Sequence, residues 1–203
     1  MKYANRLTRI ICGCLLLSFG IWGAGSSFSI AKAQLEYKHA KFGLFNGTRF
    51  EKPARTDPHE ILKSCEKAHR LYQKNYYFST LAAEKALTAA LNMPLDSAGY
   101  ESLDAMYSSA EYWDRVSMRL NPQNVEAQFV HCRILIENGD YGDAIRFWKE
   151  KVVEPAFWNP DRHEYLVHLY LNAGEKEKAV EESKWVRNSE TLNLIKKVKS
   201  GLR

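Results

Sequence analysis

A spacing of 35 residues recurs in the C-terminal half of the chain and restricts the folds that it can adopt. Gly139 lies 35 residues before Gly174, and Ala144 lies 35 residues before Ala179. Each glycine is followed directly by an acidic residue. The register therefore holds through a turn and into the helix that comes after it. A fixed period of this length is typical of arrays of stacked helical units.

The repeated unit resembles the tetratricopeptide repeat (TPR), a helix–turn–helix unit of about 34 residues. The resemblance rests on the glycine and acidic residue at the turn, the alanine that follows, and the junction Asn121-Pro122-Gln123-Asn124. Ala110 also lies 34 residues before Ala144, which agrees with the family's spacing. The resemblance implies an all-α fold: a short right-handed α-solenoid of about three antiparallel helix pairs with a C-terminal capping helix.

Apolar periodicity and capping residues predict a helical domain over residues 58–203. The predicted helices span 58–72, 76–92, 100–120, 125–138, 141–153, 160–173, 176–187 and 190–200. The first of them matches the second half of a repeat whose first half is missing. Pro155 is expected to end the helix before it, and Ser189 to cap the last helix. The repeat from 76 to 124 exceeds a 34-residue unit by about 15 residues, so an insertion is expected around 93–105.

Residues 1–33 have the pattern of a secretory signal peptide. Basic residues precede an apolar run from Ile10 to Ala24, and Ala31-Lys32-Ala33 fits a small-x-small cleavage site. The run is shorter than the roughly 20 residues that a membrane span needs. We therefore predict cleavage after residue 33 and an exported protein, periplasmic or secreted. An uncleaved N-terminal anchor is the alternative, and it is the one way in which the chain would contact a membrane.

Residues 34–57 are predicted to form an extended N-terminal tail. Gly43, Gly47 and Pro53 interrupt this segment, and it shows no sustained helical period. One interpretation is a tether that keeps the domain clear of the export site. The other is a docking segment for a partner or a lipid headgroup, because aromatic side chains alternate here with lysine and arginine.

The charge balance argues against nucleic acid as a partner. The full chain has 29 Lys and Arg against 24 Asp and Glu, a formal net charge of +5. Four of the basic residues, Lys2, Arg6, Arg9 and Lys32, lie in the predicted signal, which leaves 25 basic residues against 24 acidic ones. A chain with a formal charge near +1 has no strongly basic field to hold phosphates.

Two cysteines lie beyond the predicted signal, Cys65 and Cys132. An even count in an exported protein allows a disulfide. The repeat register instead places the two residues on helices two layers apart, facing the core. Free cysteine is among the most buried residue types, so we favour two buried thiols and keep the bridge as the alternative.

No catalytic or metal-binding pattern is found, and we predict a non-enzymatic protein without a cofactor. His163 and His168 are five residues apart, whereas a zinc-protease helix needs histidines four apart. Cys65 and His69 lie one helical turn apart without an orienting acid or an oxyanion site. The pair Cys65 and His69 is more simply interpreted as core packing.

The resemblance to the TPR family also implies a concave groove lined by the first helix of each pair, and a protein or peptide as its occupant. Apolar side chains at these positions are interspersed with charges of both signs. Carried over to this sequence, the groove positions are Tyr77, Thr80, Glu84, Glu126, Phe129, Arg133, Ile136, Asp161, Glu164, His168 and Asn172.

We therefore predict an exported adaptor that binds a partner protein in this groove during assembly of an envelope or secreted complex. Two alternatives remain. One is a structural subunit of a larger complex that uses the convex face and the N-terminal tail. The other is an accessory enzyme domain acting on the cell wall, which would need paired carboxylates such as Asp161 and Glu164, although their spacing suits a surface pair.

Overall fold

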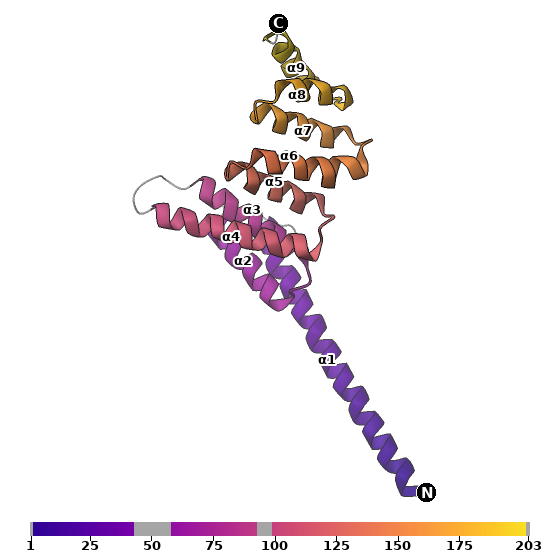
Figure 1. Cartoon of the computed structure of the whole chain (residues 1–203). Coiled ribbons are helices and arrows are strands. Elements are labelled where there is room, and N and C mark those ends of the chain that lie inside the picture. The colour runs from indigo at the N-terminus through magenta and orange to yellow at the C-terminus, as the bar shows by residue number, and fades with distance from the viewer. Residues whose placement is uncertain (1, 43–57, 93–98, 202–203) are drawn as a thin grey trace.

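The computed structural model describes the backbone of residues 2–42, 58–92 and 99–201, and side chains over 17–38, 41, 60–92 and 102–201. All regular structure in these ranges is helical, so the all-α prediction is confirmed (Figure 1). The α-helices are α1 (Lys2–Phe42), α2 (Pro58–Leu71), α3 (Tyr76–Leu91), α4 (Gly99–Leu120), α5 (Val125–Glu137), α6 (Tyr141–Trp148), α7 (Pro160–Asn172), α8 (Lys176–Glu182) and α9 (Ser189–Gly201).

The helices stack as antiparallel pairs in one direction along the domain (Figure 1). α3 packs on α4, α5 on α6 and α7 on α8, and each pair contacts the next. α9 packs against α8 at the C-terminal end of the stack. It buries Thr191 and Ile195 and exposes Lys196, Lys197 and Lys199. A polar outer face of this kind shields the last layer of an open stack, which is the part predicted for the capping helix.

The 35-residue register is visible in the two turns that contain glycine. Gly139 and Gly174 have φ angles of 84° and 78°, a left-handed conformation that glycine adopts without a Cβ clash. At both turns the glycine N–H donates to the carbonyl three residues back, and the next N–H donates to the carbonyl five residues back. These hydrogen bonds measure 2.8 to 3.1 Å. The two turns therefore have the same backbone conformation and the same hydrogen bonds.

The alanines that defined the register occupy equivalent places in successive layers. Ala110 lies in α4, Ala144 in α6 and Ala179 in α8, each on the second helix of its pair. All three are fully buried. A methyl group at this position lets neighbouring helices approach closely, which a larger side chain would prevent.

The N-terminal part of the domain differs from the prediction. The extended tail predicted from residue 34 is wrong over 34–42, because these residues continue α1, and the rest of it, 43–57, lies outside the described residues. α1 packs along α2 and so supplies the first half of the repeat that the sequence left incomplete. Ala33 is fully buried in a cluster with Ala68 and Phe78. The domain predicted to begin at 58 therefore includes the end of α1.

Over the residues whose side chains the structure describes, which in α1 begin at Leu17, no helix combines the length and the apolar character that crossing a membrane requires.

The second helix of the α5–α6 pair does not end at Pro155 as predicted. α6 passes into a π-helical turn, Lys149–Val153, and then into a 3₁₀ turn, Glu154–Ala156, that contains Pro155. The Arg162 side chain donates a hydrogen bond of 2.8 Å to the Val152 carbonyl. This bond ties α7 to a carbonyl of the π-helical turn.

The two cysteines, the start of α9 and the start of α4 were also predicted from the sequence. Cys65 in α2 and Cys132 in α5 are buried free thiols, as favoured from the register. α9 begins one residue earlier than predicted, and Asn188 rather than Ser189 caps it by accepting a hydrogen bond from the Glu190 N–H. The insertion expected around 93–105 coincides with the start of α4 at Gly99, and residues 93–98 lie outside the described residues.

Candidate protein-binding groove

A shared local geometry places side chains on one face of α3, α5 and α7. An asparagine caps each of these helices: Asn75 accepts a hydrogen bond from the Tyr77 N–H at 3.0 Å, Asn124 from the Ala127 N–H at 2.7 Å, and Asn159 from the Asp161 N–H at 3.0 Å. Because the three helices start from the same cap, equal offsets from the asparagine face the same way. The positions two, five and nine residues after each cap are the predicted groove positions: Tyr77, Thr80, Glu84; Glu126, Phe129, Arg133; Asp161, Glu164, His168.

The first part of the groove is a cavity of about 570 Å³ between α1, α3 and α5. Leu81, Val125 and Val130 form apolar parts of its wall. Six predicted residues also line this cavity: Tyr77, Thr80, Glu84, Glu126, Phe129 and Arg133.

The second part is a further cavity of about 570 Å³ that adjoins the first. Val125 and Phe129 line both cavities, so the two form one continuous surface, called the groove below. Besides Phe129, three further predicted residues, Asp161, Glu164 and His168, line this part.

Aromatic side chains from three helices form the floor of the groove. The Tyr165 ring lies 4.9 Å from the Phe129 ring and 4.5 Å from the Trp148 ring, centroid to centroid. The Trp148 indole N–H donates to the Arg162 carbonyl at 2.9 Å, which fixes the indole against α7. Burial raises the pKa of Tyr165 to about 12, so its phenol stays neutral. The floor is apolar, with a hydroxyl available for a hydrogen bond.

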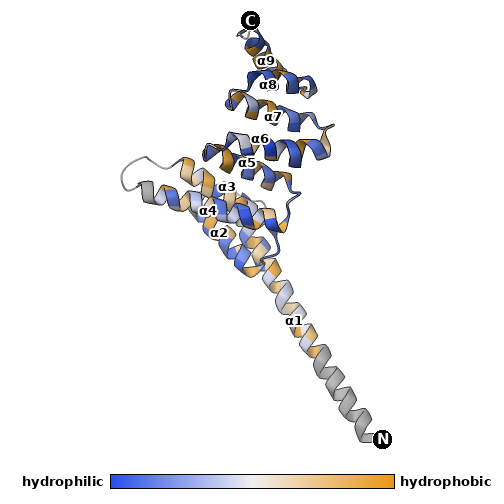
Figure 2. Cartoon of the chain, in the orientation of Figure 1, coloured by the Kyte–Doolittle hydropathy of each residue, from blue (hydrophilic) through white to orange (hydrophobic). Residues whose placement is uncertain are grey.

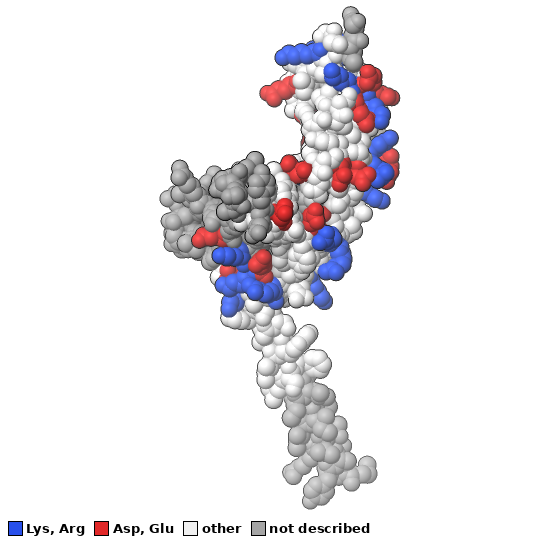
Figure 3. All heavy atoms as spheres, turned by 60° about the vertical axis from the view of Figure 1, so that its left-hand side comes forward, with Lys and Arg blue, Asp and Glu red and all other residues white. Residues whose placement is uncertain are grey.

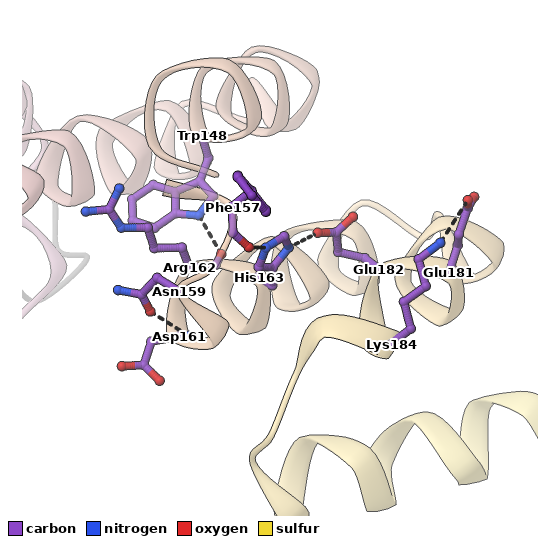
Figure 4. A network of polar contacts seen from close by, with 9 residues as sticks. All are labelled: Trp148, Phe157, Asn159, Asp161, Arg162, His163, Glu181, Glu182 and Lys184. Atoms are coloured by element: carbon purple, nitrogen blue, oxygen red, sulfur yellow. Dashed lines mark hydrogen bonds and ion pairs between the residues drawn. The ribbon is translucent and has the colours of Figure 1, made fainter. Parts of the chain in front are cut away.

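Figure 4 shows how α7 is held in place beside this floor. His163 bridges the Phe157 carbonyl, 2.6 Å from its Nε2, and the Glu182 carboxylate of α8. The same view shows Asn159 capping α7 and Trp148 bonded to the Arg162 carbonyl. A side chain that ties α7 both to α8 and to the preceding 3₁₀ turn keeps the groove face of α7 in a fixed orientation.

The rim of the groove carries charges of both signs. Glu84 and Glu126 stand beside Lys41 and Arg133 in the first cavity. In the second cavity, Glu164 accepts a hydrogen bond of 2.7 Å from the Thr191 hydroxyl, and His168 lies 3.2 Å from the same hydroxyl. α9 therefore helps to position two of the predicted groove residues.

Not every predicted residue offers its side chain to the groove. Thr80 is buried, and its hydroxyl contacts Ser117 of α4 and the Tyr76 carbonyl, so it joins helices rather than binding a partner. Ile136 is half-buried against the core around Cys132, and Asn172 is exposed. Neither Ile136 nor Asn172 lines the two cavities.

Sequence reasoning missed Tyr37 and Lys41, which α1 contributes to the groove. The Lys41 Nζ lies over the Tyr37 ring, 5.8 Å from its centroid, and burial raises the Tyr37 pKa above its ordinary value. The four-residue spacing of Ala33, Tyr37 and Lys41 fits one helical face that continues across the predicted cleavage site, but this local pattern does not establish a helix without its packing on α2.

Two features considered as possible catalytic or metal sites can be compared with the described residues. They contain no group of three or more His, Cys, Asp or Glu side chains that could hold a metal ion. Burial raises the pKa of Cys65 to about 12, so its thiol is protonated and a poor nucleophile beside His69.

Stacked antiparallel helix pairs, with first helices that share one continuous face, define the chain as a TPR-like α-solenoid. Among solved structures it is similar to TTC0263, a thermophilic TPR protein of Thermus thermophilus, with a TM-score of 0.58 at 16% sequence identity. The match covers 94% of this chain and 95% of that one. At this identity the likeness establishes the fold. Neither the protein-family models nor the curated proteins provide a match to the sequence.

Proposed function

We propose that the protein is a non-enzymatic adaptor that binds an extended or helical segment of a partner protein in the groove. The observation that carries the proposal is the continuity of the two cavities through Val125 and Phe129. A surface that spans three consecutive first helices is long enough for several residues of a bound segment. The fold supports a binding scaffold, and the groove residues are the ones that would make the contacts.

The chemistry of the groove indicates the kind of segment that it would hold. Phe129 and Tyr165 offer aromatic surface for one or two apolar anchor side chains. Large aromatic contacts of this kind contribute most of the binding energy in many interfaces. The rim would select charge: an acidic side chain fits beside Lys41 and Arg133, and a basic one beside Glu84 and Glu126.

We also propose that the adaptor works outside the cytoplasm, in the assembly of an envelope or secreted complex. The support is the basic, apolar and small-residue pattern at the start of the chain. An adaptor without a catalytic centre acts by bringing proteins together, and the assembly of a complex is a process that requires such an activity.

A photo-crosslinking experiment tests the groove. A photoreactive phenylalanine analogue replaces Phe129 in one sample and Tyr112 in another. Tyr112 is an exposed aromatic residue on α4, the second helix of its pair, and therefore a matched control. We expect a crosslinked partner from position 129 and none from 112. Phe129→Ala with Arg133→Glu should then abolish co-purification of that partner, whereas Tyr112→Ala with Arg115→Glu should not.

Two results would contradict groove binding. One is a partner that co-purifies unchanged with the Phe129→Ala, Arg133→Glu variant while circular dichroism shows an intact fold. The other is crosslinking confined to a position such as Trp158. Phe157, Trp158 and Trp185 are exposed aromatic side chains that do not line the two cavities, and crosslinks confined to them would favour the alternative of a structural subunit that docks through another face.

A further inference from the structure

α1 consists of two parts with different surroundings. Its C-terminal part lies along α2, whereas its N-terminal part projects away from the solenoid (Figure 1). In the packed part, half-buried or buried positions recur every three or four residues: Gly23, Ser26, Ser29, Ala33 and Tyr37. These positions are mostly small residues, which allow two helices to approach closely. A salt bridge of 2.5 Å between Glu36 and Lys67 of α2 lies beside this contact.

The predicted cleavage site falls inside the packed part. Ala33 is fully buried against Ala68 of α2 and Phe78 of α3. Cleavage after Ala33 would remove every small residue of the packing face and uncover both partners. The remaining helix, 34–42, would be too short to be stable by itself, because isolated helices under about 12 residues are marginal in water. A chain that began at Gln34 would therefore lack a proper first layer.

The projecting part of α1 exposes a large apolar surface. Four large apolar side chains there are between 68% and 74% exposed: Leu17, Phe19, Ile21 and Trp22. Phe28, farther along α1, is 69% exposed. Since each residue turns a helix by about 100°, these positions lie on several sides of α1 rather than on one stripe. Figures 2 and 3 show this part without strongly hydrophilic or charged residues up to its grey start. So large an exposed apolar surface indicates a partner, and a lipid bilayer can cover all sides of a helix at once.

The sequence supports this occupant. The apolar run from Ile10 to Ala24 continues without a charged residue to Ala31, through glycine and serine with Phe28 and Ile30. The whole uncharged stretch is as long as the roughly 20 residues that a bilayer requires. It reaches back beyond Leu17, where description of the side chains begins. Basic residues flank it, with Lys2, Arg6 and Arg9 on one side and Lys32 on the other. Lysine and arginine at the start favour a cytoplasmic N-terminus and a solenoid on the opposite side of the membrane.

We propose that α1 is retained as a membrane anchor whose N-terminal part enters the lipid bilayer and whose C-terminal part is the first helix of the solenoid. Ala31 and Lys41 lie on one unbroken helix, so the end of the uncharged stretch is about 15 Å from the first wall of the groove. The groove is thereby held at a fixed height above the membrane surface. This inference is independent of what the groove binds.

The test uses the full chain with a C-terminal tag, produced in a bacterium that exports proteins. Membranes are washed with alkaline carbonate, and the mass of the tagged protein is measured in each fraction. We expect a chain that begins at Met1 in the washed membranes. A soluble chain that begins at Gln34 would overturn the proposal.

A pair of double variants shows whether α1 is the part that enters the bilayer. Leu17→Asp with Ile21→Asp should move at least about tenfold more protein into the soluble fraction, because two carboxylates in the bilayer core strongly disfavour insertion. Phe157→Asp with Trp158→Asp changes two equally exposed side chains on the solenoid and should leave the distribution unchanged. Equal behaviour of the two variants would reject α1 as the anchor.

A second pair tests the packed part in detergent, where the bilayer has no role. Ala33→Leu forces three methyl-sized groups into a filled contact and should lower the melting temperature by several degrees. Ala31→Leu makes the same change at an exposed position two residues away and should not lower it. If both variants melt like the unaltered protein, α1 is not part of the solenoid.

Discussion

At the scale of single residues, the turns between paired helices depend on backbone freedom more than on contacts. Gly139 and Gly174 hold positive φ, and a Cβ added at either would meet no atom within 4 Å. Glycine is thus required at these two turns for its backbone conformation, and not because a side chain would clash with its neighbours. Any L-amino acid there must adopt a left-handed backbone, which costs about 1–2 kcal/mol.

The neighbouring glycine in α6 provides an internal control for this argument. Gly139→Ala should lower the free energy of unfolding by about 1 kcal/mol because of the positive φ. Gly142→Ala should raise it by about 0.5–1 kcal/mol, because Gly142 is helical and its added Cβ also meets nothing within 4 Å. Urea unfolding of both variants measures the difference. Two changes of the same sign would show that the turn does not need the left-handed conformation.

At the scale of elements, the sequence predicted those helices whose ends are marked by local capping and turn residues. The caps at Asn124 and Asn159 and the glycine turns are local signals, and most helices from α3 onward lie within one residue of their predicted bounds. The exceptions are α6 and α8, which end at Trp148 and Glu182, five residues before their predicted ends, and continue as π-helical or 3₁₀ turns. The pairing of α1 with α2 is different, because it depends on contacts across a long separation in the chain. Local propensity alone does not stabilise a short helix, so the helical state of 34–42 could not be inferred without α2.

The same division applies to the groove. Nine of the eleven predicted positions line the cavities because the offset from each cap is a local property. Tyr37 and Lys41 required knowledge of a distant pairing. The π-helical turn after α6 was also missed, and the bond from Arg162 of the next helix to the Val152 carbonyl in this turn is a tertiary contact that no local pattern indicates. Local cues therefore predicted the groove face, and tertiary contacts completed its walls.

α9 allows a test of whether a terminal helix stabilises the stack through its buried face. Ile195 is 2% exposed and packs into the core around Leu166 and Val167, whereas Leu194 beside it is 40% exposed. Ile195→Ala should lower the free energy of unfolding by about 2–4 kcal/mol. Leu194→Ala should change it by less than about 1 kcal/mol. Calorimetry measures the stability of both variants. Equal losses of unfolding free energy would mean that α9 does not stabilise the stack through its buried face.

At the scale of the whole molecule, the core contains ionisable groups that folding keeps neutral. Burial raises the pKa of Cys65 and of Cys132 from 9.0 to about 12, and that of Tyr165 from 10.0 to about 12. Between these values the folded chain binds more protons than the unfolded chain. Stability from these groups is complete below pH 9 and is lost as the pH rises toward 12.

The two thiols make this dependence testable because they can be removed without adding charge. Each group lowers the free energy of unfolding by up to about 1.4 kcal/mol per pH unit between its unfolded and folded pKa values. The unaltered chain should therefore lose stability steeply between pH 9 and pH 11. A Cys65→Ala, Cys132→Ala variant should start less stable at pH 8, because each change leaves a small cavity, yet lose less over the same interval. Urea unfolding at several pH values measures both slopes. Identical slopes would mean that the thiols reach water in the folded state, which the tight stacking of α2 and α5 against their neighbours does not allow.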